Sequence, residues 1–355
     1  MEYNDSLLEL IGNTPVLKLN RIAKDVPANI FVKLELFNPS GSYKDRMALA
    51  MIEAAERGDT WNGKKLEPGG IVCDASAGNT APALAFVSAL KGYQSKLCIY
   101  PPLLRGESTR LKIIGAYGPD INKCSHPTNY MSEEKFESIP EEEKELAFVI
   151  AGKRHMADLE EHHENAVWVD QIYNKYNYIG QKNIGYEVYE QLDGEIDAWG
   201  CAAGSGATLL GVALALEEKG LKPYTFGIVP HGSESYMRLE KSPAQKGEYE
   251  ISDMNHQLVE WMGLKKWQTE NSILEVMMEK GYPDEFFQVS AEDARDMANR
   301  LCQEEGIYCG MSSGANVFIA HRIAEKMKPG ENVVTTIVDR RDRYLGEYPN
   351  EIFVV

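Results

Sequence analysis

Short runs of apolar and β-branched residues alternate along this chain with longer stretches in which apolar residues recur every three or four positions. The short runs have the composition of strands, and the longer ones have the period of helices that pack on one face. We expect strands at residues 29–36, 70–76, 96–102, 197–203, 224–230, 306–311 and 333–339. We expect helices at residues 45–58, 80–92, 208–220, 291–305 and 314–328. This alternation predicts an α/β fold with parallel sheets covered on both faces.

Two regions interrupt the alternation. Residues 122–150 are acidic and punctuated by proline, and they are expected to form a solvated helical flap rather than a domain. Residues 234–280 show no clear period, although their aromatic residues suit a pocket or a dimer contact. His162 and His163 are adjacent, so on a helix their side chains do not face one another, which favours a surface pair over a metal site.

Composition narrows the possible partners. The 355 residues are enough for roughly two domains of about 150 residues each. A formal charge of −17 argues against nucleic acid, which requires clustered Lys and Arg. The N-terminus is acidic where a secretory signal is positive, so a cytoplasmic location is expected. Residues 198–216 carry no charge, but their Gly, Ala and Ser favour a buried turn and core helix over a membrane span.

The six cysteines lie far apart and include no C-x-x-C pair. This spacing indicates neither a disulfide framework nor a zinc site. We therefore expect buried, apolar roles at Cys73, Cys98, Cys124, Cys201, Cys302 and Cys309.

Four expected strand-to-helix junctions share one composition of glycine and hydroxyl residues. They read NPSGSYKD (38–45), DASAGNTA (74–81), AAGSGATL (202–209) and GMSSGANV (310–317). Helix capping and tight turns explain any single junction. Four of them at the carboxyl ends of parallel strands indicate a ligand site, because open α/β sheets bind ligands at that edge.

The turn at residues 204–208 would present backbone N–H groups and two hydroxyls at a helix N-terminus, which suits a phosphate. It lacks the lysine of a triphosphate-binding loop, and its glycines do not have the dinucleotide spacing. A monophosphate cofactor without a metal is therefore favoured. The turn at 76–80 suits a second anion, such as a carboxylate.

Lys44 opens a helix, where the macrodipole disfavours a cation. That field, together with burial, would lower the pKa of its amine and make it nucleophilic. A lysine beside a monophosphate site is what a Schiff-base cofactor requires. Asp45 and Arg46 are interpreted as helix-start and packing residues.

Together these motifs resemble the cysteine synthase and cystathionine β-synthase family of fold-type II pyridoxal-phosphate enzymes. The resemblance runs from IGNTPVLKL near residue 11 through NPSGSYKDR, SAGNT, KGYQ, IGAYG, GSGAT and EEGIYCGMSSGA to DRYL at 342–345. It covers most of the chain apart from residues 122–150 and roughly 234–280. It implies pyridoxal 5'-phosphate, small amino-acid substrates, a homodimer and two open, mainly parallel-sheet domains of the tryptophan synthase β-like type.

The resemblance also assigns roles by position. Lys44 resembles the catalytic lysine that forms the internal aldimine, and Asn79 the residue that binds the cofactor's 3-hydroxyl. Ser312 corresponds to the hydroxyl at the pyridine nitrogen. The phosphate cup corresponds to Gly204, Ser205, Gly206, Ala207 and Thr208, and the substrate-carboxylate site to Ser76, Ala77, Gly78, Thr80 and Gln171. No metal is implied.

The implied domains are residues 48–165, with the carboxylate loop and the acidic insertion, and residues 1–47 plus 166–355, with the phosphate cup. The implied reaction is β-replacement, through an α-aminoacrylate, on an O-activated L-serine or L-cysteine. β-Elimination or hydrolysis of L-cysteine with release of hydrogen sulfide stays open, as does replacement with a non-sulfide nucleophile. A catalytically silent binding homologue is an alternative of another class, against which intact Lys44, Asn79 and Ser312 count.

The sequence departs from the family pattern at three places. The family's TSGNT is SAGNT here, so Ala77 replaces a substrate-contacting hydroxyl. The late GIGAGFIP loop has no counterpart in residues 234–280, and PDSGERYL has become VDRRDRYL. These departures bear on the β-substituent and the nucleophile rather than on the cofactor site.

Overall fold

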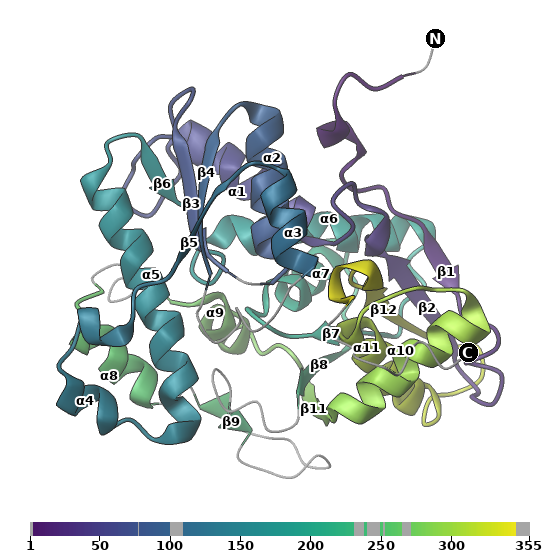
Figure 1. The fold of residues 1–355 in the computed structure, drawn as a ribbon. Helices are drawn as coiled ribbons and strands as arrows, with labels where there is room; N and C mark the ends of the chain where they lie inside the picture. The colour runs from purple at the N-terminus through teal and green to yellow at the C-terminus, as the bar shows by residue number, and fades with distance from the viewer. Residues whose placement is uncertain are drawn as a thin grey trace.

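The structure is a computed structural model that describes residues 3–76, 78–99, 109–230, 238–239, 249–250, 253–264 and 271–345. It confirms the expected α/β class, with two open sheets that are mainly parallel (Figure 1). The strands are β1 (Val16–Lys18), β2 (Asn29–Leu34), β3 (Ile71–Ala75), β4 (Gln94–Ile99), β5 (Asp120–Lys123), β6 (Ala166–Trp168), β7 (Ala198–Ala202), β8 (Tyr224–Pro230), β9 (Arg238–Leu239), β10 (Tyr249–Glu250), β11 (Glu285–Val289) and β12 (Asn332–Ile337).

The structure describes eleven helices, of which five lie within four residues of the positions expected from their period and six were not expected. The eleven are α1 (Lys44–Arg57), α2 (Thr80–Lys91), α3 (Thr109–Ala116), α4 (Glu133–Glu137), α5 (Lys144–His162), α6 (Lys175–Gln191), α7 (Ala207–Glu218), α8 (Asp253–Trp261), α9 (Ile273–Glu279), α10 (Ala291–Glu305) and α11 (Met311–Ala324). All five helices expected above are present. Short 3-10 turns link several elements.

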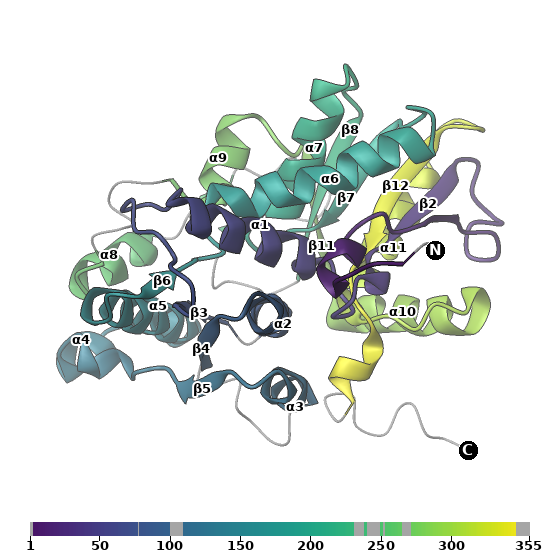
Figure 2. The same cartoon turned by 90° about the horizontal axis from the view of Figure 1, so that it is seen from above.

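The larger sheet has the strand order β1-β2-β12-β7-β8-β11, in which only β1 and β2 pair antiparallel. Alternate residues of its strands point to opposite faces, as strand geometry requires. Ala198 and Val333 pack toward α10 and α11, whereas Trp199 and Val334 pack toward α6 and α7. The helices therefore cover both faces of this sheet (Figure 2).

The smaller sheet has the order β5-β4-β3-β6 and is entirely parallel. Cys73 and Trp168 pack with α5 on one face, and Val72 and Val167 pack with α1 and α2 on the other. Its strand β6 (Ala166–Trp168) lies just beyond residue 165, where we placed the domain boundary. The division into two domains stays a prediction.

Helix α1 joins the two halves, because it packs against both α2 and α6 (Figure 2). Its approach to α6 is close at Gly180, where a Cβ atom would lie 2.9 Å from the carbonyl oxygen of Arg46. A side chain at that position would push the helices apart. Glycine therefore fixes the position of the helix that begins with Lys44.

Two expectations about local structure were wrong. Residues 306–311 form no named strand but a short link between α10 and α11, with one isolated bridge from Cys309 to Arg340. The region 122–150 is not a solvated flap, since Phe136, Ile139 and Ile150 are buried in one apolar cluster with Trp168. Its apolar residues outweigh its acidic composition because they line one side of α4 and α5.

The cysteine expectation was wrong for one pair. Cys98 is the next-to-last residue of β4, which pairs with β5, and Cys124 follows β5 directly. Their Cα atoms lie 5.1 Å apart and their sulfurs form a disulfide. Cys73, Cys201 and Cys309 are buried thiols in apolar clusters, as expected. Within the described part of the chain, no helix is long and apolar enough to cross a membrane.

Candidate active site

Lys44 is held at the carboxyl edge of the larger sheet. The backbone N–H of Tyr43 donates to the carbonyl oxygen of Val338 at 3.1 Å, and Ser42 forms an isolated bridge with Asp339. These contacts fasten the start of α1 to the end of β12. The Lys44 ammonium lies 4.7 Å from the centre of the Tyr43 ring.

The surroundings of Lys44 disfavour its charged form. Burial lowers the pKa of the Lys44 amine to about 8. Its neighbour Cys201 is 2% exposed, and burial raises the pKa of that thiol to about 12, so the thiol is neutral at pH 7. No carboxylate of the described residues forms an ion pair with Lys44. Such an amine is a better nucleophile than an ordinary surface lysine.

The turn at 204–208 lies beside Lys44 and opens α7. Gly206 has the left-handed φ of +79°, and among the described residues no side chain caps this end of the helix. A Cβ atom on Gly204 would meet nothing within 4 Å, so the turn leaves open space there. The Thr208 side chain interacts with the Tyr43 hydroxyl. The backbone N–H groups at the start of α7 can therefore receive an anion.

Asn79, at the end of the turn after β3, is held by two residues from the segment that follows β12. Its Nδ2 donates to Oδ2 of Asp339 at 2.5 Å, and its Oδ1 accepts from Nη1 of Arg343 at 2.5 Å. Arg343 also donates to the carbonyl oxygen of Ser40, and the Tyr344 hydroxyl donates to Asp339. Burial raises the pKa of Asp339, while these donors oppose that shift. The network joins the turns at 38–44 and 76–80 to the end of β12.

The sequence interpretation gave Asp339 and Arg343 no role. Arg343 lies in the matching motif DRYL, and Asp339 lies in the departing segment VDRRDRYL, so both segments had been singled out. What was missing was their contact with Asn79, which lies 260 and 264 residues away.

A second set of contacts joins the 76–80 turn to Gln171. The Thr80 hydroxyl donates to Oε1 of Gln171. Nδ2 of Asn177 donates to the carbonyl oxygen of Gln171 at 2.6 Å and to Oγ of Ser205 at 3.4 Å. The expected carboxylate and phosphate sites are thus neighbours. Ser76 is buried and Gly78 is partly exposed, while Ala77 lies outside the described residues.

Ser312 lies in the first turn of α11 and is exposed. The adjacent Ser313 is buried, and its Oγ accepts a hydrogen bond from the backbone N–H of Val338 at 2.9 Å. This bond fastens α11 to the end of β12, close to the bridge between Ser42 and Asp339. No contact joins Ser312 itself to Lys44 or Asn79, so its role stays a prediction.

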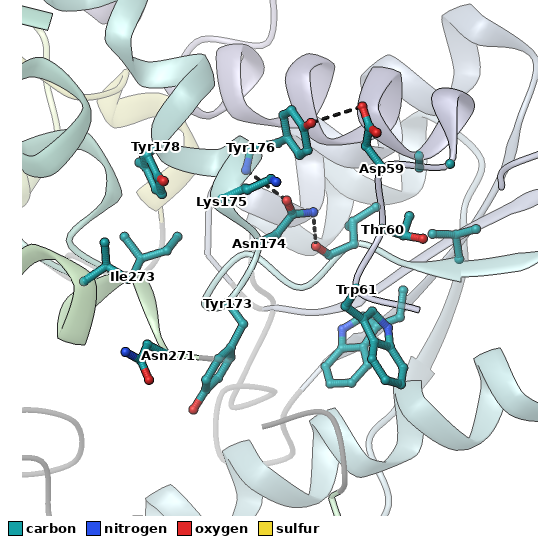
Figure 3. A pocket seen from close by; sticks show the side chains of 16 residues that line it. Asp59, Thr60, Trp61, Tyr173, Asn174, Lys175, Tyr176, Tyr178, Asn271 and Ile273 are labelled. Atoms are coloured by element: carbon teal, nitrogen blue, oxygen red, sulfur yellow. Dashed lines mark hydrogen bonds between the residues drawn. The ribbon is translucent and has the colours of Figure 1, made fainter. Parts of the chain in front are cut away.

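A cavity of about 620 Å³ lies elsewhere, between the end of α1, the loop after β6 and the start of α9 (Figure 3). It includes Gly58 at the end of α1, about 20 Å along the helix from Lys44. Its polar side chains are bonded to the protein: Asn174 to Val169 and Tyr176, and the Tyr176 hydroxyl to Asp59. This cavity is separate from the four turns.

Known proteins resemble the chain along almost its whole length. The family of pyridoxal-phosphate dependent enzymes matches residues 7–339. Cysteine synthase 1 of Emericella nidulans is 33% identical over 349 residues, which cover 96% of this chain and 84% of the relative. Cysteine synthase B of Salmonella typhimurium is 33% identical over 344 residues, which cover 96% and 94%. Cystathionine beta-synthase of Rattus norvegicus is 28% identical over 345 residues, which cover 96% of this chain but 54% of the relative.

Among solved structures, a hydrogen sulfide-producing enzyme from Fusobacterium nucleatum superposes with a TM-score of 0.72. The match covers 97% of this chain and 99% of the other, at 24% identity. At this identity the likeness concerns the fold.

Proposed function

The chain belongs to the pyridoxal-phosphate dependent enzyme family, and we propose that it replaces the β-substituent of an O-activated L-serine or of L-cysteine. Its similarity to cysteine synthases and cystathionine β-synthases supports this reaction class. The observation that carries the proposal is the Lys44 amine, which burial leaves near pKa 8 beside an uncapped helix N-terminus.

The residues of the four turns fit pyridoxal phosphate. The open space at Gly204 and the start of α7 suit its phosphate, and the Lys44 amine, whose pKa burial lowers to about 8, suits its aldehyde. We propose that Lys44 and Asn79 hold the cofactor with Gly204, Ser205, Gly206, Ala207, Thr208 and Ser312. When bound, pyridoxal phosphate supplies the electron sink that stabilises negative charge at the substrate's α-carbon.

The side chains around this site then have different roles. Lys44 holds the cofactor and afterwards accepts the proton from the substrate's α-carbon as general base. Two hydrogen bonds, one that Asn79 donates to Asp339 and one that it accepts from Arg343, keep Asn79 in one orientation. Ser76, Ala77, Gly78, Thr80 and Gln171 bind the substrate carboxylate, and the bond between Thr80 and Gln171 supports their grouping.

The test is a panel of serine derivatives and L-cysteine, with and without sulfide, homocysteine and amines, followed by mass spectrometry of the products. We expect a new β-substituted amino acid from O-acetyl-L-serine or L-cysteine when a nucleophile is present. If pyruvate and ammonia form at the same rate with and without the nucleophile, the reaction is β-elimination, and the proposal of replacement is wrong.

We also propose two domains and a homodimer, which the family resemblance suggests. Light scattering of the purified protein measures the oligomeric state. A mass equal to one chain, 39.7 kDa, would contradict the dimer.

A further inference from the structure

We propose that Lys153, in the middle of α5, is a positioning residue for the substrate-carboxylate site. This inference rests on the proposed function, in which Ser76 and Gln171 bind the carboxylate. Lys153 acts through two buried aspartates that precede Ser76 and Gln171 in the chain.

The first of these aspartates is Asp170. Nζ of Lys153 lies 2.8 Å from Oδ1 of Asp170, and the two side chains are 1% and 0% exposed. The same oxygen accepts a hydrogen bond from the backbone N–H of Ile172 at 3.1 Å. The Asp170 carboxylate is therefore bonded to the backbone on the far side of Gln171, the residue between Asp170 and Ile172. Removing the ammonium would leave a buried charge without its cation.

The backbone at Asp170 needs this support. Its φ of +44° lies in the left-handed region, which a residue other than glycine adopts only where its surroundings hold it. The ion pair to Lys153 and the bond to Ile172, both at Oδ1 of Asp170, supply that hold. The position of Gln171 depends on this conformation, because it is the next residue.

The second aspartate is Asp74, near the end of β3. It is 0% exposed, and its Oδ1 accepts hydrogen bonds from Nε1 of Trp168 at 3.1 Å and from the backbone N–H of Ala75 at 2.9 Å. Burial raises the pKa of Asp74, and the charge of Lys153 opposes that shift. The Lys153 ammonium also lies 5.6 Å from the centre of the Trp168 ring. The Lys153 ammonium therefore pairs directly with Asp170 and interacts electrostatically with Asp74.

These strand ends lead directly into the carboxylate site. Ser76 follows Asp74 by two residues, Gln171 follows Asp170 by one, and the Thr80 hydroxyl bonds to Gln171 across the gap. Lys153 thus links the two segments whose side chains meet at the carboxylate site. Helix α5 therefore contributes indirectly to substrate binding, although it begins in the region expected to be a flap.

The test compares the holoenzyme with the variant Lys153→Met, which keeps the length of the side chain without its charge. Lys144→Met on the same helix is the matched control, because Lys144 pairs with Glu141 and Glu137 near the surface. We expect Lys153→Met to raise KM for O-acetyl-L-serine and Kd for L-alanine by roughly 10- to 100-fold. Its kcat should stay within about threefold of the wild type, with unchanged cofactor content.

Asp170→Asn provides a second variant if Lys153→Met does not fold, and it should shift the same two constants. In the double variant the two effects should not add, because both single changes break one ion pair. Unchanged KM and Kd in a folded variant would overturn the proposal. So would an equal change in Lys144→Met.

Hydrogen exchange of the cofactor-free protein separates this inference from the proposed function. If the wild type binds no amino acid, the proposed function fails, but the positioning role is still measurable. Lys153→Met should then speed exchange of the Ile172 amide, which donates to Asp170. An exchange rate equal to that of the wild type overturns the inference.

Discussion

Lys44 and Lys153 are both enclosed by protein beside the proposed site, yet their neighbours differ. Lys153 has the carboxylate of Asp170 at 2.8 Å, whereas Lys44 has the neutral thiol of Cys201 and no ion pair with a described residue. Burial disfavours a charged amine unless an anion compensates for the lost water. The carboxylate therefore decides whether an enclosed lysine serves as a fixed cation or as a nucleophile.

The largest effect is expected from removing the nucleophile. Lys44→Ala should lower kcat by at least about 1,000-fold, because both the attachment of the cofactor and the general base are lost. Lys153→Met should keep kcat near the wild-type value. Steady-state kinetics of the two variants measures this contrast, with the exposed Lys175→Ala as a control. Similar losses of kcat in both variants would remove the distinction between the two lysines.

The next effect concerns stability, for which Lys153 is expected to matter more than Lys44. In the cofactor-free protein, Lys153→Met should lower the free energy of unfolding by about 3 kcal/mol, because it leaves buried carboxylates without their cation. Lys44→Met should leave that free energy unchanged or raise it, since it removes a buried amine that has no anion. Urea unfolding followed by fluorescence compares the variants. A greater loss for Lys44→Met would show that Lys44 has an anionic partner.

The smallest effect is a shift along the pH axis. Burial lowers the pKa of Lys44 to about 8, so its reactivity toward an acylating reagent in the cofactor-free protein should rise with a midpoint near pH 8. Because the unfolded chain binds this proton up to about pH 10.4, Lys44 should also make the folded state more stable as pH rises between those values. Peptide mapping after brief acylation at each pH gives the titration. A midpoint above pH 10 would mean that the amine is solvated.

The five expected helices were predictable because their signals are local. The helix at 291–305 matches α10 residue for residue: Ser290 caps its start, and Gly306 ends it at a φ of +73°. The composition of residues 306–311 predicts a strand, but in the structure residues 306–310 link α10 to α11, and Met311 begins α11. Composition alone does not show whether a neighbouring strand is available for pairing.

The candidate site was predictable where residue type and position in a turn carry the chemistry, as for Lys44 and Asn79. The supporting residues were not, because they act through contacts between distant segments. Asp339 reaches Asn79 from the segment after β12, and Lys153 reaches Asp170 from α5. No period or local motif marks such pairs.

The most direct test of the central claim is to identify the lysine that holds the cofactor. Holoenzyme is treated with borohydride, digested and analysed by mass spectrometry. The account predicts one peptide carrying a reduced pyridoxyl group on Lys44, and none in Lys44→Ala. A pyridoxyl group on Lys153, Lys33 or another lysine, or no labelled peptide from cofactor-saturated protein, would contradict it.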